Sequence, residues 1–370
     1  EWVKITLAFP GRNVTAKVWR LDVGRVPLYL LDADIEENNT PSDRFITHQL
    51  YGGDNENRLK QEFLLGIGGI RMLEKLGIHT TIYHINEGHA AFIGLERLYN
   101  LMSKYRLRFY QAVEVVRGTS LYTTHTPVPA GHDAFDEDLM RRYMPHYAER
   151  LNISWETFMG MGRANPNDPN EKFSMSALGL FLSQEVNGVS KLHGEVSRDM
   201  FQKYYPGYLS EELHIGHVTN GVHYANWTSN SWRELHTNTF GENWRNNMSD
   251  TSVWEKIYDV SDKKVWEIRN YQRKKLVNYL KERVGNDMMN RQETPRMMRK
   301  VNNGLSEDKL TIGFARRFAT YKRAHLLFNN LERLSAIVNN QDKPVQFVFA
   351  GKAHPNDKMG QDVLKHIFEI

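Results

Sequence analysis

The sequence predicts an α/β protein built on parallel sheets, and two observations point to this fold class. Short apolar stretches alternate along the chain with helix-favouring segments, an order typical of parallel βαβ units. Polar residues, mainly Gly, His, Asn and Thr, follow most of the apolar stretches. Because ligands bind beyond the carboxyl ends of such strands, these polar turns are the first candidates for a functional site. The 370 residues are enough for two or more domains.

The first part of the chain predicts strands followed by a long helix. Apolar or alternating stretches, separated by Gly and Pro, predict strands at residues 2–9, 14–23 and 26–32. A polar linker over residues 36–43 leads to a helix expected at residues 57–76. That helix contains Gly66, Gly68 and Gly69, and no strand precedes them as it would in a phosphate-binding loop. The glycines therefore indicate close packing against a neighbouring element.

The alternation of strand, polar loop and helix then begins. Strands are expected at residues 80–84, 120–122, 189–192, 214–218, 310–314 and 345–349. Between residues 232 and 304 the sequence is charged and favours helix, which predicts a helical connector. After it the pattern predicts one strand, a long helix from about Tyr321 to Asn339, a second strand and the beginning of another helix.

Composition excludes several classes of function. The 48 basic residues are interspersed with 44 acidic ones, so the net charge of +4 indicates no nucleic acid or other polyanion as a partner. The absence of cysteine excludes disulfides, thiolate metal sites and thiol nucleophiles. No apolar run reaches the ~18 residues of a membrane span, and the first residues lack the pattern of a secretory signal. We therefore expect a cytoplasmic protein, and we expect both ends of the chain to be cut.

A group of cations follows the strand expected at 310–314. Arg316 and Arg317 end that strand, and Lys322 and Arg323 come at the expected start of the next helix. Arginine forks suit phosphate oxygens, and a helix N-terminus favours anions. The Lys352 turn, at the end of the neighbouring strand, adds a further cation. The pattern indicates a phosphate or phosphosugar site, and the alternative is a solvated surface cluster.

Two other polar turns are candidates for ligand contacts. His84, Glu87 and His89 lack the spacing of a zinc protease motif, so we expect no metal there. They are expected to cap the following helix or to bind a polyhydroxylated ligand. His125 lies in a loop that is stiffened by Pro127 and Pro129. Such stiffening suits a positioned functional group, but a rigid turn needs no function. A glycosidase would need two carboxylates, for which Glu87, Asp133 and Glu195 are candidates, but no pairing follows from the sequence.

Six segments together resemble the α-glucan phosphorylase family, which acts on glycogen, starch and maltodextrin. Their order and spacing are similar to those of the family from about residue 20 onward, and their amino-acid sequences are most similar to those of its bacterial and archaeal branch. The segments are residues 50–62 (LYGGD and RLKQE), 84–92 (HINEGHAAF), 124–133 (THTPVPAGHD), 186–195 (VNGVSKLHGE), 218–223 (VTNGVH) and 313–323 (GFARRFATYKR).

The resemblance implies the glycosyltransferase B fold, in which two Rossmann-like lobes face each other, with the second lobe incomplete here. It places the N-terminal lobe at residues 1–220, the helical connector at 221–304 and the beginning of the C-terminal lobe at 305–370. It also implies retaining phosphorolysis of a terminal α-1,4-linked glucose to glucose 1-phosphate. The implied co-substrate is inorganic phosphate and the implied cofactor is pyridoxal 5'-phosphate.

The resemblance also implies roles for ten residues. His125 would line the glucose pocket near the 6-hydroxyl, with its carbonyl facing the oxocarbenium-like centre. The phosphate that attacks would be bound by Arg317 and Lys322. Around the sugar the implied residues are Asp54, Glu87, His89, Glu195 and Asn220. Beside the cofactor they are Arg316 and Trp227.

Two departures from the family pattern limit these implications. Ala319 stands where muscle and plant members have a histidine, so that phosphate contact is absent or supplied elsewhere. The cofactor lysine of the family lies in a Gly-Thr-x-x-Met-Lys segment that we expect beyond Ile370, so we expect an internal fragment that is inactive alone. The alternatives are a nucleotide-sugar-dependent glucan synthase of the same fold and a non-catalytic glucan-binding remnant. Allosteric control and a homo-oligomeric state stay open.

Overall fold

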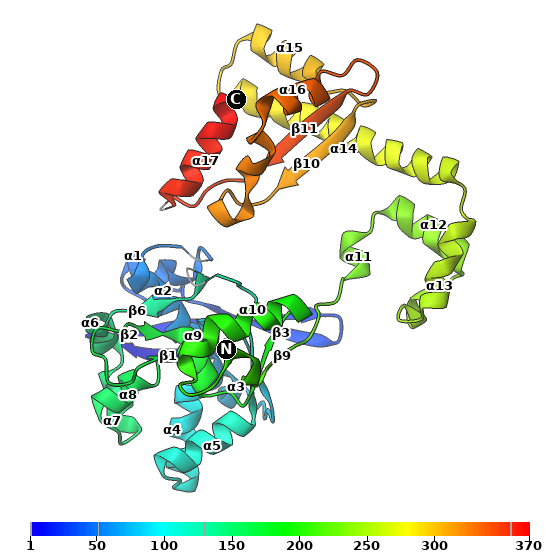
Figure 1. Cartoon of the computed structure of the whole chain (residues 1–370). Coiled ribbons are helices and arrows are strands. Elements are labelled where there is room, and N and C mark those ends of the chain that lie inside the picture. The colour runs from blue at the N-terminus through cyan, green and yellow to red at the C-terminus, as the bar shows by residue number, and fades with distance from the viewer. Residues whose placement is uncertain (1, 51, 129–130, 356) are drawn as a thin grey trace. The chain divides into compact units, whose positions relative to one another are not determined.

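The computed structural model describes residues 2–50, 52–128, 131–355 and 357–370. Tyr51, Pro129 and Ala130 of the quoted segments therefore lie outside the described residues. The chain divides into two compact units, Glu1–Gly221 and Val222–Ile370, and Figure 1 labels many of the elements of both. Each unit contains a parallel sheet together with helices, so the expected α/β class is confirmed.

The first unit opens with a three-stranded antiparallel sheet in the order β1-β2-β3. Its strands are β1 (Lys4–Phe9), β2 (Arg12–Val23) and β3 (Val26–Asp32), close to the predicted ranges. Alternate residues of β1 (Ile5, Leu7 and Phe9) are buried, as expected for a sheet with one face on the core.

The expected long helix is present with a local irregularity. It consists of α2 (Asn55–Phe63), a π-helical segment (Leu64–Gly68) and α3 (Gly69–Lys75). A Cβ atom at Gly66 would lie 2.7 Å from Phe92 Cβ, and one at Gly68 would lie 2.8 Å from Ile5 Cδ1. Close packing therefore explains these two glycines, whereas Gly69 has no such neighbour within 4 Å.

A four-stranded parallel sheet in the order β4-β5-β8-β9 positions the candidate site. Its strands are β4 (Tyr83–Asn86), β5 (Ser120–Thr123), β8 (Glu185–Gly188) and β9 (Ile215–His217). The strand predicted at 189–192 was wrong, because β8 ends at Gly188 and α10 (Lys191–Phe201) begins three residues later. The Ser190 side chain accepts a hydrogen bond from the His193 N–H and so starts the helix earlier than the apolar pattern indicated.

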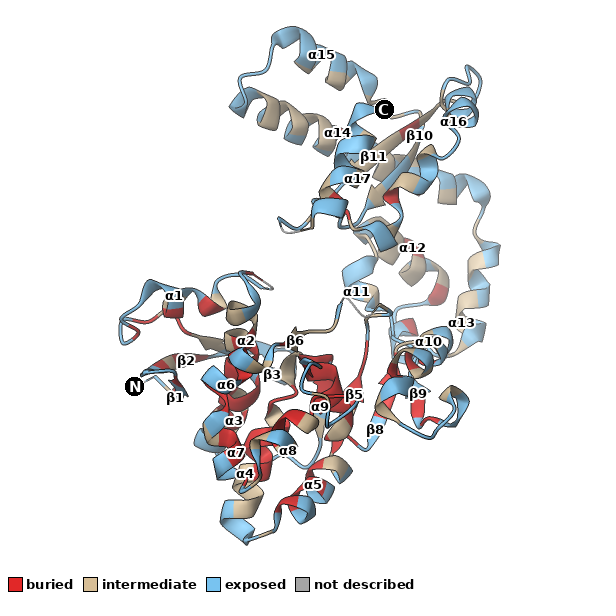
Figure 2. Cartoon of the chain, turned by 60° about the vertical axis from the view of Figure 1, so that its left-hand side comes forward, coloured by how far each residue is buried: buried red, intermediate tan, exposed pale blue. Residues whose placement is uncertain are grey.

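Helices surround these sheets and complete the core of the first unit. They are α1 (Pro41–Arg44), α4 (Ile93–Tyr105), α5 (Phe109–Gly118), α6 (Glu137–Tyr143), α7 (Pro145–Arg150), α8 (Trp155–Gly160) and α9 (Met175–Phe181). A short antiparallel pair, β6 (Ala134–Phe135) and β7 (Phe173–Ser174), was not predicted because two residues carry no periodic signal. Figure 2 shows buried residues concentrated in the strands and helices of this unit.

The second unit begins with helices. They are α11 (Tyr224–Trp227), α12 (Asn230–Phe240), α13 (Thr251–Glu255), α14 (Asp262–Asn290) and α15 (Pro295–Gly304). Four aromatic rings pack together near α12 and α13, and they belong to His236, Phe240, Trp244 and Trp254.

The rest of the second unit contains two parallel strands, β10 (Leu310–Ala315) and β11 (Val345–Ala350), with α16 (Leu331–Val338) and α17 (Lys358–Glu369). The single helix predicted from about Tyr321 to Asn339 was wrong. Residues 320–322 and 324–328 form 3-10 turns, and Arg323 between them has a φ of 56°, which no helix tolerates. The helix begins only at Leu331, where the Asn330 side chain accepts a hydrogen bond from the Arg333 N–H at 2.9 Å.

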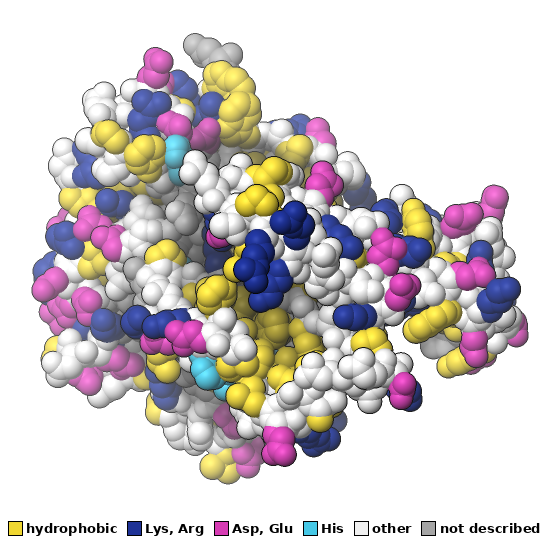
Figure 3. Space-filling model, turned by 90° about the horizontal axis from the view of Figure 1, so that it is seen from above, with side chains coloured by type: hydrophobic (Ala, Val, Ile, Leu, Met, Phe, Trp, Pro, Cys, Tyr) yellow, Lys and Arg dark blue, Asp and Glu magenta, His cyan; other side chains and the backbone are white. Residues whose placement is uncertain are grey.

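The surface carries charges of both signs. Figure 3 shows Lys and Arg interspersed with Asp and Glu over the face drawn. None of the described helices is both long and apolar enough to cross a membrane. The helix α14 has 29 residues, but it carries charged side chains along its length.

Candidate functional site

Glu87 ties the end of β4 to the loop that follows β5. Its backbone N–H donates to Thr123 O at 2.9 Å, and its buried carboxylate turns toward the loop. Glu87 Oε1 accepts from the His125 N–H at 2.7 Å and from Thr126 Oγ1 at 2.9 Å. Glu87 has a φ of 60°, a strained conformation for this residue type. The two accepted hydrogen bonds offset that strain, so Glu87 fixes the His125 loop at the carboxyl edge of the sheet.

His125 is held at its backbone and at one ring nitrogen. Its Nε2 lies 2.9 Å from Asn86 Oδ1, and because an amide oxygen only accepts, Nε2 carries the proton. The imidazole is exposed, and the His125 carbonyl accepts no hydrogen bond from the described residues. His125 therefore presents a fixed ring and a free carbonyl oxygen at the end of β5.

Four buried side-chain atoms near this loop have no hydrogen-bond partner among the described residues. They are Glu87 Oε2, Thr124 Oγ1, His132 Nε2 and His193 Nε2. His132 Nδ1 lies 3.9 Å from a Glu87 oxygen and 2.7 Å from Ser176 Oγ. Buried polar atoms are almost always paired, so several unpaired atoms around one carboxylate indicate a place where a polar ligand binds.

The two histidines of this group are neutral at neutral pH. Burial lowers the pKa of His132 and the pKa of His193, although the nearby Glu87 charge acts in the opposite direction. His193 Nδ1 accepts from the Val189 N–H at 3.3 Å, so the unpaired Nε2 atom carries the proton. His193 therefore offers one N–H donor that no described residue uses.

Asn220 is brought to the same strand ends. Its backbone N–H donates to Val189 O at 3.1 Å, and Val189 in turn contacts His193. The Asn220 side chain is exposed and makes no hydrogen bond with the described residues. The sequence-based selection included Glu87, His125 and Asn220 but missed His132 and His193, although both lie inside the quoted segments. Nothing in their spacing shows that they are buried.

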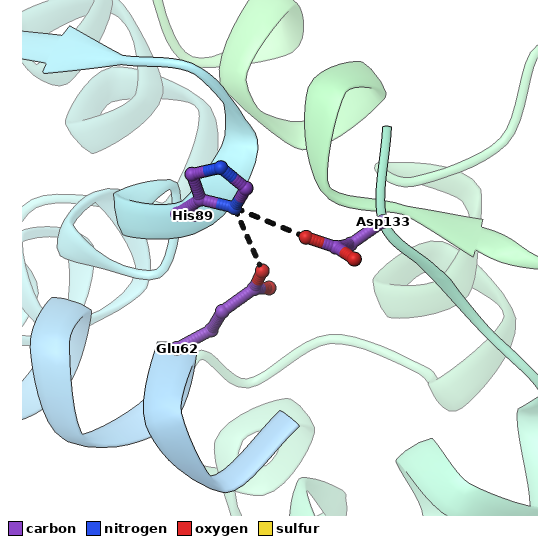
Figure 4. A group of neighbouring side chains, drawn as sticks. All are labelled: Glu62, His89 and Asp133. Atoms are coloured by element: carbon purple, nitrogen blue, oxygen red, sulfur yellow. Dashed lines mark hydrogen bonds and ion pairs between the residues drawn. The ribbon is translucent and has the colours of Figure 1, made fainter. Parts of the chain in front are cut away.

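Glu62, His89 and Asp133 form a second cluster, drawn in Figure 4. His89 Nδ1 lies 3.2 Å from Glu62 Oε1 and 3.0 Å from Asp133 Oδ2, and Arg58 donates to the same Asp133 oxygen. Burial raises the pKa of Glu62 to about 8, while hydrogen bonds to Asp133 and Glu62 raise the pKa of His89 to about 9. Burial opposes ionisation of Asp133, but hydrogen bonds from its neighbours, including His89 and Arg58, outweigh it and lower its pKa.

The charges of this second cluster favour an ion-pair network. At neutral pH His89 is an imidazolium, Glu62 is protonated and Asp133 is ionised. The three ligand atoms lie within 4.8 Å of one another, a spacing that a metal ion could bridge. However, Arg58 and His89 already place two positive charges against Asp133, so a metal cation is disfavoured. His84 bonds Thr123 Oγ1 at 2.7 Å and lies outside this network.

Two of the expected sugar residues are not brought into either group by a hydrogen bond among the described residues. Asp54 is exposed and caps α2 by accepting from the Asn57 N–H at 2.9 Å. Glu195 is exposed in the first part of α10. Helix capping therefore accounts for Asp54, and the structure gives Glu195 no partner in the described chain.

In the second unit the cationic turn follows β10 as expected. Arg316, Arg317 and Arg323 are exposed, and within the described ranges none of them pairs with a carboxylate. The Phe318 N–H donates to Lys352 O at 3.1 Å, which joins this turn to the turn after β11. A Cβ atom at Gly351 would lie 2.2 Å from Arg316 O, so the two turns approach this closely only with glycine there. The turn thus gathers unpaired cations, but on 3-10 turns and without the predicted α-helix N-terminus.

Comparisons with known proteins agree with the quoted segments. A family model described as carbohydrate phosphorylase matches residues 43–370. The maltodextrin phosphorylase of Thermococcus litoralis is 38% identical over 369 residues, which are 99% of this chain and 42% of that protein. The glycogen phosphorylase of Aquifex aeolicus is 36% identical over 370 residues, or 100% of this chain and 53% of that protein. The chain therefore spans about half the length of the curated relatives it matches.

Proposed function

Because this chain belongs to the carbohydrate phosphorylase family, we propose that it carries the glucose pocket and the phosphate-binding turn of an α-glucan phosphorylase. The reaction is reversible phosphorolysis of a terminal α-1,4-linked glucose to glucose 1-phosphate with retained configuration. In the glycosyltransferase B fold of such an enzyme, residues 1–220 form the glucan side, 221–304 the connector and 305–370 the beginning of the second lobe. The chain by itself, half as long as its relatives, is expected to be inactive.

The observation that carries the proposal is the set of unpaired buried polar atoms around Glu87. A sugar hydroxyl both donates and accepts a hydrogen bond. Glu87 Oε2 is an unused acceptor and His193 Nε2–H is an unused donor. A pocket that pairs with a sugar hydroxyl in this way gains affinity from groups that are costly to leave unpaired.

His125 and Asn220 complete the proposed glucose pocket. Breaking the glycosidic bond develops positive charge at the anomeric carbon, which a fixed oxygen dipole stabilises. The His125 carbonyl accepts no other described hydrogen bond, and Glu87 fixes the peptide that precedes it. Asn220, with its exposed amide beside the His193 turn, is the proposed partner of a sugar hydroxyl.

The proposed phosphate site is the turn that contains Arg316, Arg317 and Lys322. The Coulomb repulsion between phosphate groups is large unless cations screen it. The two arginines are exposed and lack carboxylate partners in the described chain, so their donors are free for phosphate oxygens. Lys322 Nζ lies 4.5 Å from the centre of the Tyr321 ring, a contact that leaves its hydrogen-bond donors available. Ala319 adds no contact to the phosphate.

The resemblance implies pyridoxal phosphate for the longer enzyme, but the residues present do not form a pocket for it. Trp227 ends α11 with 76% of its surface exposed, and Arg316 follows β10. No hydrogen bond, ion pair or cation–π interaction joins the two residues within the described chain. We therefore derive no step of the reaction through the cofactor.

Isothermal titration of the chain with maltotetraose tests the glucose pocket. We expect His193→Ala to weaken binding at least tenfold, because it removes the unused donor, and Glu114→Gln on the exposed face of α5 to leave binding unchanged. Equal affinity of wild type and His193→Ala would contradict the proposal.

Titration with inorganic phosphate tests the cationic turn separately. Arg317→Ala should abolish phosphate binding, whereas Arg299→Ala, which removes an exposed arginine of α15, should not. If both variants bind phosphate as wild type does, the turn is a solvated surface cluster.

A further inference from the structure

Arg97 is a buried arginine at the end of the four-stranded sheet where strands β4 and β5 begin. It lies on α4, with 7% of its surface exposed. Its contacts are with the first residues of β4 and β5, whereas the proposed glucose pocket lies beyond the last residues of these strands. Arg97 therefore has no part in the proposed reaction.

Each described contact of the Arg97 guanidinium is with an uncharged group. One terminal nitrogen donates to Ser120 Oγ at 2.7 Å and the other donates to Thr119 Oγ1. The guanidinium carbon lies 3.7 Å from the centre of the Tyr83 ring. No carboxylate lies within 4.0 Å of Arg97 in the part of the chain that the structure describes.

Two other arginines with little exposed surface in this unit are paired with carboxylates, whereas the half-buried Arg117 and Arg198 donate to backbone carbonyl oxygens. Arg71 binds Glu96 at 2.6 Å and Arg163 binds Glu137 at 2.8 Å. A buried charge without a partner is costly, and burial lowers the pKa of Arg97 to about 10, which still leaves the group protonated at neutral pH. The contrast indicates that the counter-ion of Arg97 is not a side chain of the described residues.

Arg97 lines a cavity of about 480 Å³ at this end of the sheet. Its polar lining includes Thr80, Asn100, Lys104 and Thr119, and Leu101 and Val115 contribute apolar surface. One carboxylate, Glu74, also faces the cavity, but it accepts from Asn100 at 2.6 Å and burial raises its pKa. Arg97 and Lys104 together outweigh the single charge of Glu74.

We propose that this cavity binds a small oxyanion, the carboxylate or phosphate head group of a small organic molecule, through the guanidinium of Arg97. A guanidinium has five N–H donors, so the hydrogen bonds to Ser120 and Thr119 hold the group in place and leave further donors for the oxygens of one head group. The apolar lining provides contact for the body of the molecule. This ligand site is separate from the proposed phosphate turn, which lies in the other unit.

Titration calorimetry and thermal unfolding with malonate and with inorganic phosphate test the proposal. Wild type should be stabilised by at least one of the two probes, and Arg97→Met should bind that probe at least tenfold more weakly. Arg150→Met is the matched control, because Arg150 also lies over a tyrosine ring, 4.9 Å from the centre of Tyr99, but is exposed. This control should bind as wild type does.

A second pair of variants keeps the test decisive if Arg97→Met does not fold. Val115 lines the cavity, and its carbonyl accepts from Thr119 Oγ1, the same atom that Arg97 contacts. Val115→Glu should supply an internal counter-ion and abolish stabilisation by the probe, whereas Val115→Gln should retain it.

Three outcomes would overturn the proposal. The first is that neither probe stabilises wild type, and the second is that Arg97→Met responds as wild type does. The third is that binding of the probe is lost in Arg317→Ala and kept in Arg97→Met. The last outcome would assign the anion to the cationic turn. Loss of maltotetraose binding in His193→Ala is independent of all three, so this proposal and the proposed glucose pocket can fail separately.

Discussion

The two parallel sheets of this chain differ in how deeply they are buried. In the first unit, the strand residues Ile85, Tyr122 and Val186 are almost wholly buried beneath helices. In the second unit, Leu310 and Ile312 of β10 are 54% and 43% exposed, and Figure 2 shows few buried residues there. Parallel sheets are normally covered on both faces. Side-chain packing therefore covers the first parallel sheet more completely than the second, although Phe318 in the cationic turn of the second unit is buried.

The candidate sites follow the same division. The proposed glucose pocket contains buried atoms whose positions depend on neighbours from several strands. The cationic turn contains exposed arginines, and the buried Phe318 side chain and the backbone bond from Phe318 to Lys352 join this turn to its unit. Substitutions in the pocket should therefore change both stability and binding, and substitutions in the turn should change binding alone.

The largest expected effect is on the free energy of unfolding when a leucine is replaced by alanine in each unit. Leu98→Ala, in the core of the first unit, should lower the free energy of unfolding by about 2–5 kcal/mol, because it leaves a cavity. Leu310→Ala should cost less than about 1 kcal/mol, since the side chain is half exposed. Urea denaturation followed by near-UV circular dichroism measures both. Equal losses would show that the second unit is packed as firmly as the first.

A smaller effect is expected at Glu87. Glu87→Ala removes the acceptor of two hydrogen bonds, each worth about 1.5 kcal/mol when the acceptor is charged, and should lower the unfolding free energy by about 2–3 kcal/mol. Glu195→Ala is the control, because Glu195 is exposed and has no partner in the described chain. If the two variants have the same stability, Glu87 does not fix the His125 loop.

The last expected effect is a pH dependence from Glu62 and His89. Glu62 has a pKa raised to about 8, so ionising it in the folded state costs stability as the pH rises from its ordinary value through 8. The raised pKa of His89 contributes stability that is complete below about 6.5 and lost as the pH rises through 9. Both groups therefore make the protein less stable toward pH 9.

Glu62→Gln separates the two contributions, because it keeps the shape of the side chain and removes its titration. One unit of pKa shift corresponds to about 1.4 kcal/mol, so between pH 6 and pH 9 wild type should lose on the order of 2–3 kcal/mol more than Glu62→Gln. Urea denaturation at the two pH values measures this. Identical losses in the two proteins would mean that Glu62 is ionised throughout the range.

The sequence predicted strands well where apolar residues end at a clear turn, as at Val26–Asp32, which matches β3. It failed where one local contact decides the boundary. Ser190 caps α10 earlier than the apolar pattern indicates, and the left-handed Arg323 interrupts the helix expected after Thr320. Capping and single backbone dihedrals act over two or three residues, below the resolution of a periodic pattern.

The candidate site shows a similar limit. Glu87 and His125 could be selected because each follows a strand, and Asn220 could be selected from the resemblance to the family. His89 meets Glu62 and Asp133, which are 27 and 44 positions away along the chain, so their mutual pKa shifts depend on tertiary packing. The burial that leaves His132 and His193 neutral, and their Nε2 atoms without a described partner, depends on tertiary packing too.

The most direct test of the account is the imidazole NMR spectrum of the chain with and without saturating maltotetraose. We predict that the Nε2–H resonance of His193 shifts on binding, because this unused donor pairs with a sugar hydroxyl, while the resonance of His84, bonded to Thr123, stays in place. Maltotetraose binding that leaves the His193 signal unchanged would place the sugar elsewhere and contradict the central claim.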